Sequence, residues 1–333
     1  MISELIINAF LVTLMLGIAI SLLRTRSIIF TVILTSAYSL IAALMFITLD
    51  AVDVAFTEAS VGAGISTILF LAAMGYLPKE EEKSINNQFI PAMSCIILGA
   101  VLIWCSFDLP EIGIASAPIH LHLVPDYILG SQNDIAIPNI VTSILASYRG
   151  YDTFGETVVI FTAGIAVLAL LQNSKTAKIL LKRKQRKKLL KMYKNPILRV
   201  CTKVLFAPII LFGLYVQFHG DYGPGGGFQA GVIVASAFIL YSLVFGLDEG
   251  QKLLPPKINL ILLALGAILY GGVGIISMSM GEPFLSYDVL GKNPQAGQHL
   301  GILIIEFGVG LTVCNVMISL FNSFAGYRSD KGS

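Results

Sequence analysis

The sequence predicts an all-α membrane protein whose chain crosses the bilayer about nine times. Hydrophobic residues make up 56% of the 333 residues, and charged residues make up only 13%. A soluble domain carries about 25% charged residues, because its surface must contact water. The low charge, the long apolar runs and the uneven placement of lysine and arginine together exclude an ordinary soluble enzyme and a disordered chain.

Each expected span is an apolar run that approaches or exceeds the roughly 20 helical residues needed to cross the hydrocarbon core. Polar residues, glycine or proline separate one run from the next. The expected helices cover approximately residues 5–23, 27–48, 52–76, 89–106, 153–172, 200–218, 228–247, 258–280 and 300–321.

The basic residues predict the orientation, because lysine and arginine favour the cytoplasmic side of a membrane. With the N-terminus outside, the inner loops and the C-terminal tail hold all of the 22 lysines and arginines except Arg149 and Lys292. We therefore expect the N-terminus outside the cell and the C-terminus in the cytoplasm.

The outer loop from Phe107 to Pro138 is too long for a plain connector and contains no lysine or arginine. His120 and His122 form an HxH motif in it. Either a metal site or an interfacial contact with a partner fits this loop, and the contact is the simpler interpretation.

The basic segment at residues 173–197 is expected to be a cytoplasmic anchor that contacts anionic lipid. It lacks the base-reading or aromatic motifs of nucleic-acid binding, so we expect no nucleic-acid partner. The four cysteines lie in apolar runs without CxxC spacing, and we find no catalytic or nucleotide-binding motif. We therefore expect no cofactor, no metal and no enzymatic activity in this chain.

Three carboxylates inside the spans are the first functional candidates, because a charge within the bilayer is costly. Glu58, Glu156 and Glu306 lie in helices that run from outside to inside in the expected topology. Each follows the expected start of its span by roughly 5–9 Å at 1.5 Å per residue. Their similar depth predicts one hydrated ion pathway; the alternative is interfacial carboxylates that pair with neighbours or with headgroup water. No span carries a lysine at its centre.

Asp53 is a further candidate, five residues before Glu58. In a regular α-helix this spacing points the two carboxylates in different directions. A π-bulge would change their relative direction, and the glycines of residues 62–64 permit either such a bulge or close helix packing.

A second acidic pair occurs in SYRGYDTFGET, where Asp152 and Glu156 are spaced i, i+4. Arg149 lies beside them at the outer boundary. We expect Arg149 to pair with Asp152, because pairing lowers the cost of burying each charge.

The most distinctive motif is QFHGDYGPGGGFQAG, residues 217–231. Pro224 and the three glycines after it, Gly225, Gly226 and Gly227, preclude regular helix and predict a tight turn. Irregular backbone at the membrane edge needs protein or water around it, so we expect this turn to pack against another subunit. His219 and Asp221 beside the turn are candidates for proton access or an ion pair.

The motif resembles the signature of the MnhB/MrpB-type subunit of the multisubunit Mrp/Mnh-type Na⁺/H⁺ antiporters. AVDVAFTEASVGAGISTILFLAA is similar to the D-type subunit of membrane-bound hydrogenases and to the C-terminal part of the large A-type antiporter subunit. SILASYRGYDTFGETVVIFTAGIAVLAL is similar to the adjoining E-type element. The expected organisation is an MbhD-like module with the following helix (1–106), the outer loop (107–138), an MbhE-like element (139–172), the basic linker (173–197) and an MnhB/MrpB-like four-helix domain (198–325).

This resemblance implies a multi-pass subunit of a Na⁺ or K⁺/proton antiporter in the cell membrane of a bacterium or archaeon. The implied partners are the large proton-translocating subunits, other small subunits and membrane lipid. Carried over to this sequence, the ion-path positions are Asp53, Glu58, Asp152 and Glu156. The family often has a second histidine where this chain has Asp221. Two alternatives stay open: a membrane-arm subunit of a redox-driven complex such as membrane-bound hydrogenase, and a purely structural linker.

Overall fold

The computed structural model describes residues 2–74, 77, 89–111, 114–171 and 195–326, and the regular elements within these ranges are helices. Nine of the described helices are long and apolar enough to cross a membrane. They are α1 (Ile2–Arg24), α2 (Ile28–Thr48), the continuous stretch of α3 (Val52–Glu58), η1 (Ala59–Ile65) and α4 (Ser66–Ala73), α5 (Phe89–Ser106), α9 (Gly150–Leu171), α11 (Pro196–His219), α12 (Gly227–Phe245), α14 (Pro256–Ser279) and α15 (Pro294–Gly326).

The predicted all-α class and the nine predicted spans are therefore confirmed. The outward N-terminus and the domain boundaries stay predictions. The basic linker expected at residues 173–197 lies almost wholly outside the described residues.

Short helices join the long ones. The outer loop contains α6 (Pro118–Leu121), α7 (Leu123–Gly130) and η3 (Ser131–Ile135); α8 (Ile140–Ser143) and η4 (Ile144–Tyr148) lead into α9; α13 (Leu247–Leu253) and η5 (Asp288–Leu290) lie in the last third of the chain. The segments η1, η3 and η4 are π-helical. A π-helix makes i→i+5 hydrogen bonds and often marks a functional site.

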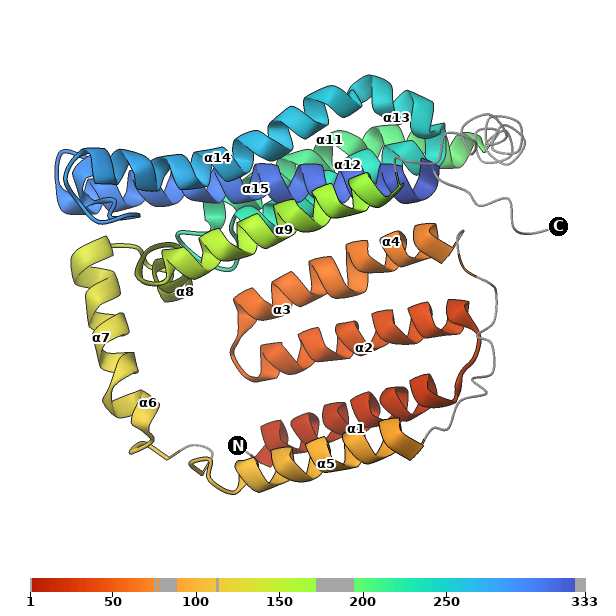
Figure 1. Ribbon diagram of the computed structural model, residues 1–333, viewed down its shortest axis with the longest axis horizontal. Helices are drawn as coiled ribbons and strands as arrows, with labels where there is room; N and C mark the ends of the chain where they lie inside the picture. Colours follow the sequence, from red (N-terminus) through yellow and green to blue (C-terminus); the bar gives the residue numbers. More distant parts are fainter. Residues whose placement is uncertain (1, 75–76, 78–88, 112–113, 172–194, 327–333) are drawn as a thin grey trace.

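The helices α11, α12, α14 and α15 pack as a tight bundle (Figure 1). Glycines permit this close approach, as small residues do between membrane helices. A side chain at Gly227 or Gly231 of α12 would collide with the backbone of α15, and one at Gly266 of α14 would collide with it from the other side. Because α15 lies between these neighbours, 67% of the residues in its most apolar stretch are buried, against 33% for α14. It is the central helix of the bundle.

The earlier spans extend to one side of this bundle (Figure 1). The helix α9 packs on α15 and α14, and the stretch from α3 to α4 contacts α2, α12 and α15. The helix α1 packs on α2, whereas α5 has no buried residue. A helix that is apolar all round needs lipid or another protein chain to cover it.

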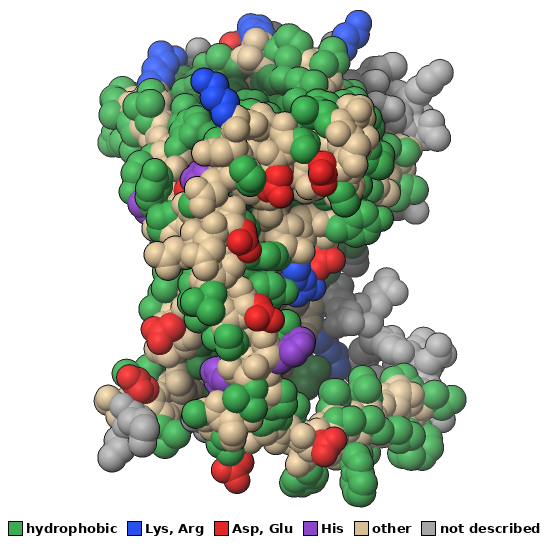
Figure 2. Space-filling view, turned by 90° about the vertical axis from the view of Figure 1, so that its left-hand side faces the viewer, with side chains coloured by type: hydrophobic (Ala, Val, Ile, Leu, Met, Phe, Trp, Pro, Cys, Tyr) green, Lys and Arg blue, Asp and Glu red, His purple; other side chains and the backbone are tan. Residues whose placement is uncertain are grey.

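The surface agrees with a lipid environment. Large hydrophobic side chains are exposed on each of the nine described spans, among them Phe10, Trp104, Val159 and Ile261. Acidic side chains are spread over the end of the molecule where α9 and α15 begin (Figure 2). This distribution is expected for a membrane protein whose polar groups gather where its spans leave the apolar layer.

Candidate functional site

The glycine loop, residues 220–226, joins α11 to α12 and folds back onto the end of α11. The N–H of Gly226 donates to the carbonyl of Val216 at 3.1 Å, and the N–H groups of Tyr222 and Gly223 both donate to the carbonyl of His219. Gly226 has φ 128° and ψ 179°, a backbone conformation that is essentially restricted to glycine. The glycine is therefore required where the loop enters α12.

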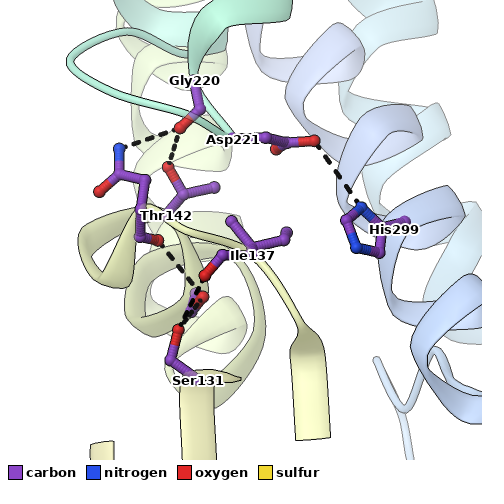
Figure 3. A network of polar contacts seen from close by, with 8 residues as sticks. Ser131, Ile137, Thr142, Gly220, Asp221 and His299 are labelled. Atoms are coloured by element: carbon purple, nitrogen blue, oxygen red, sulfur yellow. Dashed lines mark hydrogen bonds and ion pairs between the residues drawn. The ribbon is translucent and has the colours of Figure 1, made fainter. Parts of the chain in front are cut away.

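The segment before α9 holds the glycine loop from one side (Figure 3). The Asn139 side-chain amide donates to the carbonyls of Gly220 at 2.9 Å and Gly223 at 3.0 Å, and its backbone N–H donates to the carbonyl of Asp221. The Thr142 hydroxyl donates to the same Gly220 carbonyl at 2.7 Å. Packing of this turn against another subunit stays a prediction, because residues of the same chain hold one side of it while Tyr222 and Pro224 are exposed.

Buried serines fix the segment that presents Asn139. The Ser131 hydroxyl donates to the Ser143 hydroxyl at 2.7 Å and also contacts the carbonyl of Ile137. These bonds join η3 to α8 across the turn between them (Figure 3). Because buried polar groups are held by such bonds, the start of α8 keeps one position against the glycine loop.

The helix α3 holds the glycine loop from another side. The Asp53 carboxylate accepts a hydrogen bond from the N–H of Gly225 at 3.2 Å, and the Gln229 amide donates to the Thr57 hydroxyl at 2.7 Å. Asp53 and Thr57 are four residues apart, so they share one face of α3. The carboxylate also lies near the N-terminus of α12, where the helix dipole favours negative charge.

A cavity of about 340 Å³ lies where these elements meet, and three of the predicted carboxylates line it: Asp53 from α3, Glu156 from α9 and Glu306 from α15. Its other polar lining consists of the glycine loop and the side chains of Thr57, Thr142, Thr153, Thr157, Gln229 and Tyr270. The described residues that line it include no lysine or arginine. The cavity therefore brings three carboxyl groups together without a basic side chain beside them.

Glu306 lies directly against the glycine loop. A Cβ atom built on Gly220 or on Gly226 would lie 3.3 Å from one of the two Glu306 carboxylate oxygens. The backbone of Glu306 itself contacts Gly227 at the start of α12. The helix α15 therefore delivers this carboxylate to the place where α11 ends and α12 begins.

Glu58 faces a different neighbour. A Cβ atom built on Gly62 would contact both the Glu58 carboxylate and the Ser39 hydroxyl of α2. The π-helical segment η1 begins directly after Glu58, and the carbonyl of Ala63 within it accepts hydrogen bonds from Ser36 of α2 and from Thr67. The bulge that the glycines permit is thus present, and Glu58 does not line the cavity of Asp53.

Asp152 and Arg149 form the ion pair that the sequence predicted. The Arg149 Nε atom donates to the Asp152 carboxylate at 2.6 Å. Both side chains are more than half exposed, at 61% for Arg149 and 51% for Asp152. Such exposed pairs contribute about 0–1 kcal/mol to stability. Neither residue lines the cavity, although Asp152 lies one helical turn before Glu156.

The two candidates beside the glycine loop, His219 and Asp221, face different neighbours. His219 stacks on Tyr215, with ring centroids 5.0 Å apart. Asp221 instead faces His299 of α15, with 3.9 Å between the carboxylate oxygen and Nδ1 (Figure 3). Burial raises the pKa of the Asp221 carboxyl, and the nearby His299 opposes part of this rise. His120 and His122 lie at α6, and no group of three metal-binding side chains occurs among the described residues.

Two buried tyrosines, which the sequence analysis did not single out, fix the approach to α9. The Tyr270 hydroxyl donates to the carbonyl of Gly150 at 2.7 Å, and the Tyr287 hydroxyl donates to the carbonyl of Ala146 at 3.0 Å. These carbonyls lie at the junction of the π-helical η4 and α9, six residues or more before Glu156. The tyrosines therefore set the direction in which α9 leaves this junction.

The fold and the cavity define a multi-pass membrane protein with a carboxylate-lined site inside its helices. Three family models match successive parts of the chain: MbhD, the D-type subunit of MBH, at residues 13–79; MbhE, the E-type subunit of MBH, at 91–188; and the domain related to MnhB subunit of Na⁺/H⁺ antiporter at 197–319.

Antiporter subunit mnhB2, the name given to the matching proteins of the Staphylococcus aureus strains Newman and JH1, is 39% identical over 136 residues. The match covers 40% of this chain and 96% of those relatives. The chain therefore belongs, through its C-terminal domain, to the MnhB antiporter-subunit family. The resemblance seen in the sequence motifs is confirmed.

Two solved structures share this fold over most of the chain. A chain of the Mrp complex from Dietzia sp. DQ12-45-1b matches 97% of this chain with a TM-score of 0.75 and 23% identity. This chain spans 35% of that longer chain, so the match shows a shared fold within one part of it. A chain of the membrane-bound sulfane sulfur reductase, an archaeal respiratory membrane complex, matches 71% of this chain and 97% of its own length, with a TM-score of 0.54 and 26% identity.

Proposed function

We propose that this chain is a membrane subunit of a multisubunit Na⁺ or K⁺/proton antiporter and that its three modules together form one section of the ion path. The observation that carries the proposal is the cavity lined by Asp53, Glu156 and Glu306. Each carboxylate comes from a region matched by a different family model. The family membership of the C-terminal domain supports antiport as the activity of the assembly.

The chemistry of the cavity suits a proton or a hard monovalent cation. Carboxylate, hydroxyl and amide oxygens are the ligands that such cations prefer. Three carboxylates in one cavity favour a bound cation or a proton, because neighbouring negative charges disfavour one another. A site that exchanges a proton for a metal cation must be able to bind either of them at the same carboxylates. Moving one charge through the membrane adds about 2.3 kcal/mol for each 100 mV of potential.

The other predicted carboxylates keep outlying roles in the proposal. Glu58, which lies against Ser39 of α2, is a separate ion-binding position on the side of the first two helices. Asp152, paired with Arg149, lies one turn outside Glu156 and guides cations toward it. His219, stacked on Tyr215, holds the end of α11. We propose no enzymatic role for any of these groups.

The partners follow from the exposed surfaces. The helix α5 has no buried residue, and Glu156 is exposed although it lines the cavity. An exposed carboxylate within a spanning segment needs water or protein beside it. We therefore place the large antiporter subunits and the other small subunits around these surfaces, with lipid covering the remainder.

A redox-driven complex is the second candidate. Two observations favour it: the matches to the D-type and E-type MBH subunits, and the shared fold with the sulfane sulfur reductase complex. Purification of the tagged chain in mild detergent, followed by mass spectrometry, separates the two functions. Large antiporter subunits without iron–sulfur proteins support the antiporter, whereas co-purified iron–sulfur subunits support the redox complex.

The transport test uses the complete complex in vesicles from cells that lack other antiporters. A pH-sensitive dye then reports proton movement after Na⁺ or K⁺ is added. We expect Glu306→Gln to abolish exchange while the complex still assembles on a native gel, and Glu58→Gln to have a smaller effect because Glu58 lies outside the cavity. Full exchange with Glu306→Gln would refute the cavity as part of the ion path.

A further inference from the structure

A second cavity, of about 370 Å³, lies on the other side of Glu306. The end of α11, the adjoining loop, the middle of α14 and the first half of α15 line it, and its polar lining is Gln217, Asp221 and Glu306. Glu306 is the carboxylate that lines both this cavity and the one shared with Asp53 and Glu156. One side chain therefore lies between two cavities that share no other lining residue.

The second cavity leads from Glu306 to the Asp221–His299 pair. His299 precedes Glu306 by seven residues, which is two turns of α15 or roughly 10 Å along one face of the helix. Leu303 lies between them on the same face and lines the cavity. Asp221 lines it too and faces His299 (Figure 3). Both members of the pair are partly exposed, at 42% for His299 and 24% for Asp221.

The side chain of Gln217 indicates water in this cavity. Gln217 is only 9% exposed, and its side chain lines this cavity. Its Oε1 atom lies against α15, because a Cβ atom on Gly310 would be 2.7 Å from it. A nearly buried amide needs hydrogen-bond partners, and a cavity of this size has room for water that would supply them.

We propose that the second cavity is a hydrated access route that carries protons between the Asp221–His299 pair and Glu306. A proton on the pair passes to cavity water and then to the Glu306 carboxylate. Glu306 releases it into the first cavity, where it exchanges with the cation, and the pair takes up another proton from the loop side. The charged or titratable groups around Glu306 are Asp53, Glu156 and Tyr270 on one side and Asp221 with His299 on the other.

This inference rests on the proposed antiport function but has its own test. Leu303→Trp fills the second cavity without replacing a carboxylate. Leu300→Trp is the matched control, because Leu300 lies one turn earlier on α15, is similarly exposed (43% against 47%) and lines neither cavity. Both variants are compared with the wild type in the vesicle assay, with assembly checked on native gels.

We expect Leu303→Trp to slow exchange by at least about tenfold, the scale expected when a proton-transfer route is lost, and Leu300→Trp to stay within about twofold of the wild type. Unchanged exchange with Leu303→Trp overturns the inference. If Glu306→Gln still abolishes exchange in that case, the proposed function stands, and the second cavity holds lipid or a partner side chain instead.

A second variant covers the case in which the tryptophan prevents assembly. Asp221→Asn combined with His299→Gln removes both titrating groups of the pair without adding volume. Exchange slowed about tenfold in the assembled complex supports the route. Exchange at the wild-type rate overturns it.

Discussion

The Asp53 carboxylate accepts a hydrogen bond from the backbone N–H of Gly225, although 172 residues separate the two in sequence. This bond joins the third span to the glycine loop between α11 and α12. Asn139 and Thr142 bind the same loop from another side. Regions matched by three different family models therefore meet at one irregular turn. A site built from three modules in this way depends on the turn keeping its shape.

Separate substitutions at Asp53 distinguish its charge from its hydrogen bond. We expect Asp53→Asn to keep the acceptor and the assembly but to lower exchange, because one of the cavity charges is lost. Asp53→Ala removes the acceptor as well and should cost a further 0.5–1.5 kcal/mol of stability, approximately the value of one hydrogen bond. Thermal unfolding of the purified complex measures this difference. Equal melting temperatures for the two variants would show that the bond to Gly225 does not stabilise the assembly.

Gly226→Ala should distort the loop and disturb Glu306. Its positive φ makes a side chain costly by about 1–3 kcal/mol, and the new Cβ would press on the Glu306 carboxylate. We expect less complex in the membrane and strongly reduced exchange in what remains.

Two glycine controls separate the causes. Gly281 also has a positive φ, 91°, but a Cβ there meets no atom within 4 Å, so Gly281→Ala introduces strain alone. Gly272 lies inside α14 with open space beside it, so Gly272→Ala should be neutral or slightly stabilising. Exchange by Gly226→Ala equal to that of Gly281→Ala would exclude the contact with Glu306 as a cause of the loss.

The sequence predicts the spans well because the bilayer imposes one strong rule on each of them. About 20 apolar residues are needed per helix, and this requirement is visible without any tertiary contact. The position of each carboxylate along its helix is visible in the same way. The direction in which it points is not: Asp53 faces the glycine loop, whereas Glu58, after which η1 begins, faces α2.

Contacts between distant parts of the chain leave weaker signals. The sequence places His219 two residues from Asp221, yet the histidine that faces Asp221 is His299, brought there by the packing of α15. Nothing in the sequence distinguishes Tyr270 and Tyr287 from other tyrosines. In the structure their hydroxyls donate hydrogen bonds to backbone carbonyls at the η4–α9 junction. Only helix packing, which hydropathy does not specify, creates these pairs.

Tyr270→Phe tests whether the η4–α9 junction is held by a hydroxyl. The Tyr270 ring is fully buried. Removing its hydroxyl takes one hydrogen-bond donor away from the carbonyl of Gly150. We expect a loss of about 0.5–1.5 kcal/mol, approximately the net value of one hydrogen bond. Tyr151→Phe is the control, because Tyr151 is 72% exposed and keeps its ring contacts as phenylalanine. Similar melting temperatures for the two variants would contradict a structural role for the Tyr270 hydroxyl.

The raised pKa of Asp221 predicts how the stability of the complex changes with pH. Burial raises its pKa above the ordinary value of 3.8, so the folded protein favours the protonated carboxyl. A group with a raised pKa contributes stability that is fully present below its unfolded pKa and is lost as the pH rises through its folded pKa. The melting temperature of the wild type, relative to that of Asp221→Asn, should therefore fall as the pH rises from the unfolded pKa of Asp221 to its higher folded pKa. The comparison uses the purified complex at constant ionic strength, so that groups common to both proteins cancel. A relative melting temperature that rises with pH would show that the ion pair with His299 outweighs the burial of Asp221.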